Sequence, residues 1–107
     1  MAKFMIKVSY TAEGLRGVRK EGAAARAAYI AQLLESVGGS LESFYFAFGA
    51  DDVILIVDMP DNKTAMAMAA AVSASDAISA YETIPLVTTQ EVDAAMKMPV
   101  GYRAPGT

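Results

Sequence analysis

Two apolar segments separated by four residues restrict the folds open to this chain more than any other feature. Residues 41–48 and 53–59 carry large apolar side chains at both odd and even positions, and Gly-Ala-Asp-Asp separates them at 49–52. Alternate residues of a strand point to opposite faces, so each face of this pair needs a covering layer. Glycine and aspartate favour tight turns. The sequence therefore predicts an antiparallel hairpin that is buried on both faces.

A strand and a long helical segment precede the hairpin. Apolar residues alternate along residues 3–10, which is typical of a strand with one buried face. Three glycines before Ala23 weaken the start of the helix that follows by about 1 kcal/mol each, so we expect that start to be irregular or bent. The pair Gly38-Gly39 should end the helix. The apolar stripe of its second half consists of Tyr29, Ile30, Leu33, Leu34 and Val37.

A second helix and a fourth strand follow the hairpin. Pro-Asp-Asn at 60–62 ends the preceding strand and offers an N-cap to a helix over about residues 62–75. Residues 77–87 are expected to form a strand at the edge of the sheet, because Pro85 has no N–H to donate. Thr88 and Glu91 have the spacing of a capping box, which predicts a short helix through about residue 97.

The element order βαββαβ is that of the ferredoxin-like arrangement, an α+β fold with a four-stranded antiparallel sheet. We expect a single domain over residues 1–98 and an extended tail over residues 99–107. Two helices cover only one face of such a sheet, so the other apolar face needs a second subunit. The predicted assembly is a homodimer, or a higher assembly of dimers, in which two sheets pack face to face as a dimeric α/β barrel.

Composition and charge argue against several classes of function. The chain of 107 residues has no histidine and no cysteine, so the usual zinc ligands and a thiol nucleophile are lacking. We therefore expect no metal and no cofactor. The net charge is −3 and the basic residues form no cluster, which disfavours nucleic acid as a partner. We find neither a signal-peptide core nor an apolar run that could cross a bilayer, so we expect a cytoplasmic protein without a membrane partner.

Six stretches of the chain, taken together, resemble the GYD-domain family. They are SYTAEGLRGV, KEGAAAR, SVGGSLESFYFAFG, DVILIVDMPDN, TTQEVDAA and GYRAPG. The signature of the family at the hairpin has the form F-G-x-Y-D-V. Gly49 and Asp52 match it, and Asp51 stands in place of the tyrosine. The resemblance implies a dimeric α/β-barrel protein and no particular activity, and a role that rests on the signature tyrosine is not expected here.

Asp51 and Asp52 admit two interpretations. They could bind a divalent cation or share a proton, or they could only stabilise the turn through hydrogen bonds. Adjacent residues of an extended segment point to opposite faces, and Mg²⁺ or Ca²⁺ would need further oxygen ligands that this stretch does not provide. The turn interpretation is therefore favoured over an ion site.

A ligand pocket is expected against the inner end of the first helix. Its predicted residues are Tyr10, Arg26, Tyr29, Tyr45 and Asp52. Tyr29 can place a hydroxyl at the edge of the core, and Arg26 would attract one anionic group. Further candidates for lining a cavity, between sheet and helices or between subunits, are Asp58, Tyr81 and Glu82. The alternative is that the tyrosines only pack, with Tyr45 at the surface between subunits.

Three classes of function agree with these features. The favoured interpretation is a homo-oligomeric protein that binds a small molecule or has an accessory role. A cofactor-independent enzyme, of the oxygenase or isomerase type and acting on a small apolar substrate, is the second. The lack of histidine weighs against it, because proton transfer would fall to Tyr, Asp, Glu or Lys. A protein-interaction module that docks through its open sheet is the third.

Overall fold

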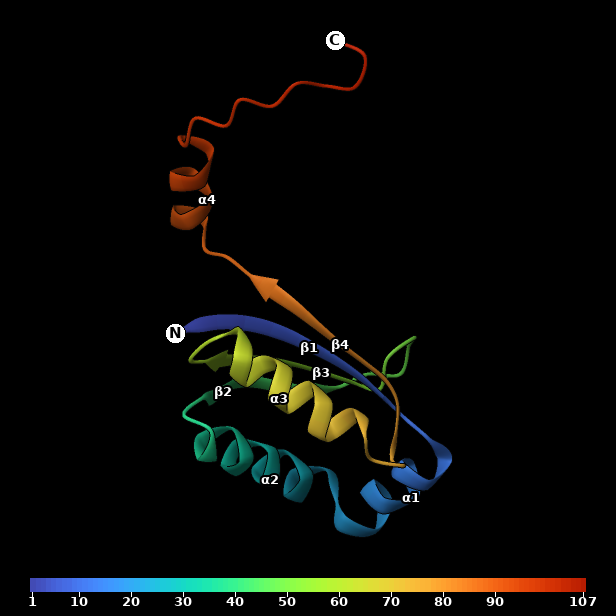
Figure 1. Ribbon diagram of the computed structural model, residues 1–107. Coiled ribbons are helices and arrows are strands. Elements are labelled where there is room, and N and C mark those ends of the chain that lie inside the picture. Colours follow the sequence, from blue (N-terminus) through green and yellow to red (C-terminus); the bar gives the residue numbers. More distant parts are fainter.

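The computed structural model describes residues 1–107 and has the predicted element order (Figure 1). Its elements are β1 (Ala2–Tyr10), α1 (Ala12–Glu21), α2 (Ala23–Ser36), β2 (Ser40–Phe46), β3 (Val53–Met59), α3 (Asn62–Ser73), β4 (Ile78–Leu86) and α4 (Thr89–Met96). The four strands form one antiparallel sheet in the order β2-β3-β1-β4. This is the predicted α+β ferredoxin-like fold. None of the helices combines the length and the hydropathy needed to span a membrane.

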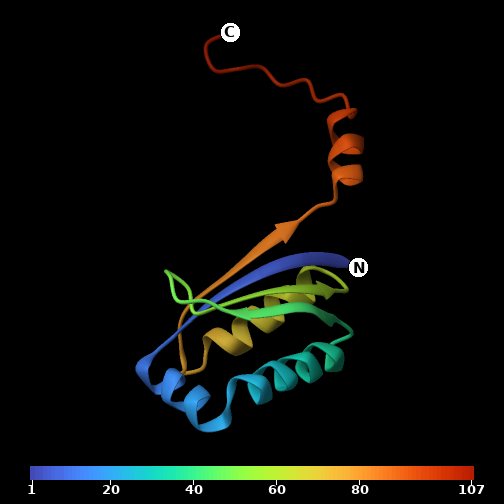
Figure 2. The ribbon, with the colours of Figure 1, turned by 180° about the vertical axis from the view of Figure 1, so that it is seen from behind.

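Helices α2 and α3 lie on one face of the sheet and enclose the core (Figures 1 and 2). Strands β1 and β3 occupy the middle of the sheet, and Ile6 lies opposite Leu55 between them. Alternate residues of both strands point to the helices, as period-two patterning requires. The buried core consists of Phe4, Ile6, Val8, Leu34, Val53, Leu55, Val57, Met59, Ala65 and Met68.

The opposite face of the sheet, which we call the open face, has no covering layer within the chain. The residues that alternate with the core positions belong to it, among them Met5 on β1, Ile54 and Ile56 on β3, and Ile84 on β4. The sheet of one chain is open and does not close into a barrel. The apolar centre of this face is therefore available to another molecule.

The long helical segment is divided into α1 and α2 at Gly22, whose φ of 102° is favourable only for glycine. The predicted irregular start is thus a separate helix. Thr11 caps α1, with its hydroxyl accepting from the N–H of Gly14. At the other end of the segment, Gly38 has a φ of 84°, which confirms the predicted helix termination.

The predicted apolar stripe of α2 is narrower than expected. Ile30 and Leu33 pack against the core around the buried Leu34, but Tyr29 and Val37 are 45% and 38% exposed. Each helical residue is turned by about 100° from the one before it. Tyr29 therefore lies at the edge of the side of α2 that faces the sheet, not at its centre.

Most of the predicted caps and ends are confirmed. Asp61 caps α3, the capping box of Thr88 and Glu91 opens α4, and β4 is an edge strand. The end of β2 is not where we expected it. The strand stops at Phe46, and the hydrogen bond from the amide of Ala47 to the carbonyl of Asp52 closes the hairpin, so the turn begins earlier than expected. Phe48 lies in the loop and is fully exposed.

Helix α4 and the residues after it project away from the sheet and the other helices (Figure 2). The radius of gyration is 17.0 Å, whereas a compact domain of this length has about 13 Å. The residues that follow β4 therefore add length to the molecule without adding to its core.

Candidate functional site

A small cavity lies between the sheet and the two helices that cover it. Strands β1 and β3 contribute Val8 and Leu55, and helices α2 and α3 contribute Ile30 and Val72. The cavity has a volume of about 50 Å³, and 12 of its 13 lining residues are hydrophobic. Arg26 is the exception. The cavity can therefore accept an apolar group, with a single cation at its border.

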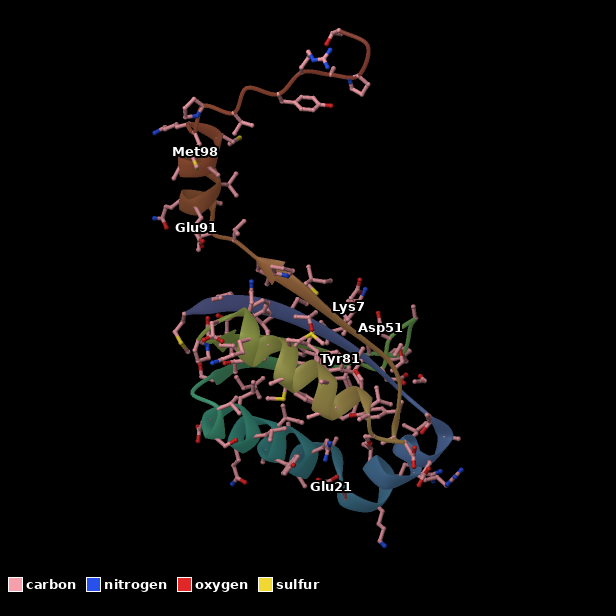
Figure 3. The ribbon with its side chains drawn as sticks, viewed as in Figure 1. Lys7, Glu21, Asp51, Tyr81, Glu91 and Met98 are labelled. Carbon is pink, nitrogen blue, oxygen red and sulfur yellow. The ribbon has the colours of Figure 1, made fainter.

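Tyr81 brings a polar group into this apolar lining. It lies on β4 opposite Val8 and packs against the core (Figure 3). Burial raises the pKa of its phenol to about 12, although a hydrogen bond with Thr83 acts in the opposite direction. The phenol is therefore neutral at physiological pH and can donate a hydrogen bond to a group in the cavity.

Tyr10 and Arg26 lie where the cavity meets a wider polar cleft. Burial raises the pKa of the Tyr10 phenol, and the neighbouring guanidinium of Arg26 partly opposes this effect. The cleft, of about 460 Å³, is lined by residues of α1 and of the turn before β4, and it includes both Tyr10 and Arg26. The apolar cavity and the polar cleft are thus adjacent, and the phenol of Tyr10 and the guanidinium of Arg26 lie between them.

Arg26 is held in place by two neighbours on its own helical segment. Its guanidinium lies 4.9 Å from the centroid of the Tyr29 ring, within the range of a cation–π contact. It also pairs with the carboxylate of Glu21 at 3.7 Å. Sequence reasoning missed Glu21. The signal for it was the break at Gly22, which turns the chain so that the end of α1 meets the start of α2.

Tyr10 is fixed at this site by Asp52. The Oδ2 atom of Asp52 accepts from the N–H of Tyr10 at 2.8 Å, and the N–H of Asp52 donates to the carbonyl of Val8 at 2.9 Å. The pairing of β1 with β3 ends at Val8, so the amide of Tyr10 has no partner on β3. Asp52 supplies the missing acceptor and connects the hairpin loop to the border of the cavity.

Asp51 points to a different partner. Its carboxylate pairs with the ammonium of Lys7 at 3.2 Å, and Figure 3 shows the two residues close together beside the hairpin loop. Glu82 approaches the same lysine at 3.7 Å. Hydrogen bonding to Asp51, with smaller contributions from the charges, raises the pKa of Lys7. The adjacent aspartates thus have separate partners and do not form a shared site.

The other end of the open face carries a similar group. Lys3 pairs with Glu42 at 2.6 Å and with Asp58 at 3.1 Å, and its hydrogen bond to Glu42 is the main reason that its pKa is raised. Asp58 and Glu82, two of the candidates for lining a cavity, are therefore engaged on the open face. No group of three or more potential metal-ligating side chains is present.

The five predicted pocket residues are only partly brought together. Tyr10 and Arg26 line the cavity, and Asp52 supports Tyr10. Tyr29 lies outside the lining but stacks against Arg26. Tyr45 pairs with Ile54, so it belongs to the open face, and it is 69% exposed. Tyr81, one of the further candidates named from the sequence, lines the cavity together with Tyr10.

Comparison with known proteins supports the fold and gives the family. The crystal structure of MtbAldR has a TM-score of 0.59 to this chain at 23% sequence identity, over 81% of this chain. At this identity the likeness concerns the fold alone, and the chain spans 53% of that structure. The search of curated proteins gives no match. The model of the GYD domain matches residues 4–96, nearly the whole length described above. The chain therefore belongs to the GYD-domain family.

Proposed function

We propose that this protein is a homo-oligomeric small-molecule-binding protein whose ligand has an apolar part and one anionic group. The observation that carries the proposal is that the apolar cavity and the polar cleft share Tyr10 and Arg26 in their linings. The apolar part of the ligand would enter between sheet and helices. Its anionic group would stay at the border, where Arg26 offers a charge and Tyr10 a hydrogen-bond donor.

The size of the cavity limits the ligand. A space of about 50 Å³ holds only a few atoms; drug-sized ligands occupy about 300 Å³ or more. A longer apolar chain would require α2 to move away from the sheet. Leu34 is the only fully buried residue of α2, and Gly22 separates this helix from α1. Helix α2 is thus the element that would adapt to the ligand.

Oligomerisation is part of the proposal because of the open face. Met5, Ile54, Ile56 and Ile84 form an apolar centre on a sheet that lacks a second layer in the chain. Two chains related by a twofold axis would cover this centre mutually, since the same patch serves both partners. The lysine–carboxylate groups at its two ends would lie at the rim, where such pairs remain solvated.

Binding is favoured over catalysis by the protonation of the tyrosines. Burial raises the pKa of both Tyr10 and Tyr81, and a phenol of this kind is a hydrogen-bond donor rather than a base at neutral pH. The carboxylates that contact Tyr10 and Arg26 are both engaged, since Asp52 accepts from the amide of Tyr10 and Glu21 pairs with Arg26. This weighs against a proton-transfer reaction at the border of the cavity.

The experiment uses octanoate and 1-octanol, which share the apolar chain and differ in charge. We expect octanoate to raise the melting temperature in proportion to RT ln(1 + [L]/Kd) and octanol to raise it less. Arg26→Met, which keeps an apolar stem, should abolish the difference between the two probes. Arg19→Met on α1 is the control, since Arg19 is exposed and lines neither the cavity nor the cleft. Equal shifts in the natural protein would refute an anionic ligand.

A further inference from the structure

The segment after β4, residues 88–107, which we call the arm, forms no side-chain hydrogen bond and no ion pair with the rest of its own chain. Every residue from 87 to 107 is exposed. The hydrogen bonds of the arm, such as those of the capping box and that from the hydroxyl of Thr107 to the carbonyl of Ala104, stay within it. The first part of the arm is nevertheless a regular helix, α4, which is capped at its start.

The arm exposes several large apolar side chains to water. Its large apolar side chains are 37–78% exposed: Val92, Met96, Met98, Val100 and Tyr102. Val92, Ala95 and Met96 follow the i, i+3, i+4 spacing of one helix face. Helix α4 therefore has an apolar face with no partner in its own chain.

The exposed area indicates how large the missing contact is. The chain exposes 7308 Å² at a mass of 11.2 kDa. A compact monomer of this mass exposes about 5,700 Å², so the excess is roughly 1,600 Å². Stable interfaces bury about 800 Å² per partner, and obligate dimers more. The excess area of one chain is thus what an obligate dimer would cover.

The position of the arm indicates what it contacts. Both ribbon views show it rising from the end of β4 on the side of the sheet away from α2 and α3 (Figures 1 and 2), and Glu91 and Met98 mark its course in Figure 3. Ile84, on the open face, lies five residues before α4 begins. A second chain placed on the open face would meet the arm directly.

We propose that the arm packs on a second copy of this chain, so that two sheets paired through their open faces are held by two exchanged arms. The inference rests on the pairing of open faces described under the proposed function. The arm carries Glu91, Asp93, Lys97 and Arg103, a balanced set of charges. It therefore lacks the basic excess by which a segment would bind an anionic bilayer or a nucleic acid.

The chain has no cysteine, so single thiols can report where the arm lies. Met98→Cys places a thiol in the arm, and Met66→Cys places one on α3. Both methionines are 66% exposed in the single chain, which makes them a matched pair. In the dimer we expect alkylation of Met98→Cys to be about tenfold slower than that of Met66→Cys, because thiol reactivity follows exposure.

The same pair is then measured in the Ile56→Lys background, with the oligomeric state followed by sedimentation. Ile56 lies on the open face at partial exposure, so lysine can reach water in a monomer while opposing the pairing of sheets. We expect Ile56→Lys to yield monomers and to restore equal alkylation rates. Slow alkylation of Met98→Cys in the monomer would show an arm folded back on its own chain and would overturn the inference.

Two other results separate the inference from the proposed function. If the natural chain sediments as a dimer and the two thiols react equally, the arm is free and only the inference fails. If the natural chain is monomeric at all concentrations, the pairing of open faces fails as well.

As a second test, Val92→Lys with Met96→Lys should weaken the dimer by about tenfold or more, and Met66→Lys should not. An unchanged dissociation constant in the double variant would contradict the arm exchange.

Discussion

Gly14 and Gly17 allow one substitution to be compared at two sites of the same helix, with opposite expected results. A Cβ atom at Gly14 would lie 2.1 Å from the carbonyl oxygen of Ala77, while a Cβ at Gly17 would meet no atom within 4 Å. The carbonyl of Ala77 belongs to backbone and also accepts from the N–H of Thr11 at 2.9 Å. The obstacle at Gly14 is therefore not a side chain that can rotate away.

The expected change in the free energy of unfolding follows from the contacts that each substitution must alter. A carbon and a carbonyl oxygen need about 3.3 Å between them, so Gly14→Ala must move α1 by roughly 1 Å. Overpacking of this kind costs about 1–3 kcal/mol, and the strained hydrogen bond of Thr11 adds about 1 kcal/mol. Alanine returns up to about 1 kcal/mol of helix propensity. The net expectation is a loss of about 2 kcal/mol for Gly14→Ala and a gain of about 0.5–1 kcal/mol for Gly17→Ala.

The assay is urea unfolding of both variants and the natural protein at one protein concentration, because the stability of an oligomer depends on concentration. The two variants should differ by about 3 kcal/mol in the free energy of unfolding, or by about 13 °C in melting temperature. Gly14 lines the polar cleft, and the forced movement of α1 in Gly14→Ala would change the cleft, so octanoate binding should also weaken in this variant. Equal stabilities would mean that α1 is not held against the turn before β4, and would refute the reasoning.

Three further predictions concern the residues around the cavity. Tyr29→Phe keeps the ring beneath Arg26 and should leave octanoate binding unchanged by calorimetry, while Tyr29→Ala should weaken it; a loss in Tyr29→Phe would mean that the hydroxyl contacts the ligand. Asp52→Ala removes the acceptor of the Tyr10 amide and should cost about 1–3 kcal/mol in urea unfolding, with Asp52→Asn closer to the natural protein; the opposite order would contradict this role. The raised pKa of Tyr81 favours the neutral phenol in the folded state, so its contribution to stability is present below pH 10 and is lost as the pH rises towards 12. Between these pH values the free energy of unfolding of Tyr81→Phe should therefore fall less steeply with pH than that of the natural protein. An identical dependence on pH would argue against burial of the phenol.

Two residues of the family signature now have separate explanations. The carboxylate of Asp52 accepts from the amide of Tyr10, which has no partner on β3 because the β1–β3 pairing ends at Val8. Asp52 therefore holds the backbone of Tyr10 at the border of the cavity. Asp51, at the place of the signature tyrosine, pairs with Lys7 on the open face. A change at this position would therefore alter the surface that we assign to the partner chain rather than the cavity.

The sequence by itself determined the order of the elements and most of their ends. Helix and strand periodicities, the caps at Asp61 and Thr88 and the stops at glycine depend on residues close to one another in the chain. The break at Gly22 was indicated in the same way, by glycines that weaken a helix locally. Such interactions are nearly the same in any fold, and this is why a single sequence was sufficient to predict the ferredoxin-like arrangement.

Only the tertiary structure decided which tyrosines share a site. Tyr10, Tyr29, Tyr45 and Tyr81 are similar in the sequence, and each stands near other apolar residues. Whether a strand residue faces the helices depends on register, because a shift of one position moves every side chain to the opposite face. Tyr81 therefore faces the cavity from its position opposite Val8, and Tyr45 faces away from it beside Ile54.

The same distinction holds for the arm. The capping box and the apolar spacing predicted α4, but no local signal indicated whether that helix would cover its own sheet or leave it. The direction in which β4 ends places α4 on the side of the sheet away from α2 and α3, and that direction depends on the packing of the whole chain (Figure 1). Contacts between residues far apart in sequence have no periodic pattern of their own, so the sequence determined the helix and the tertiary structure determined its place.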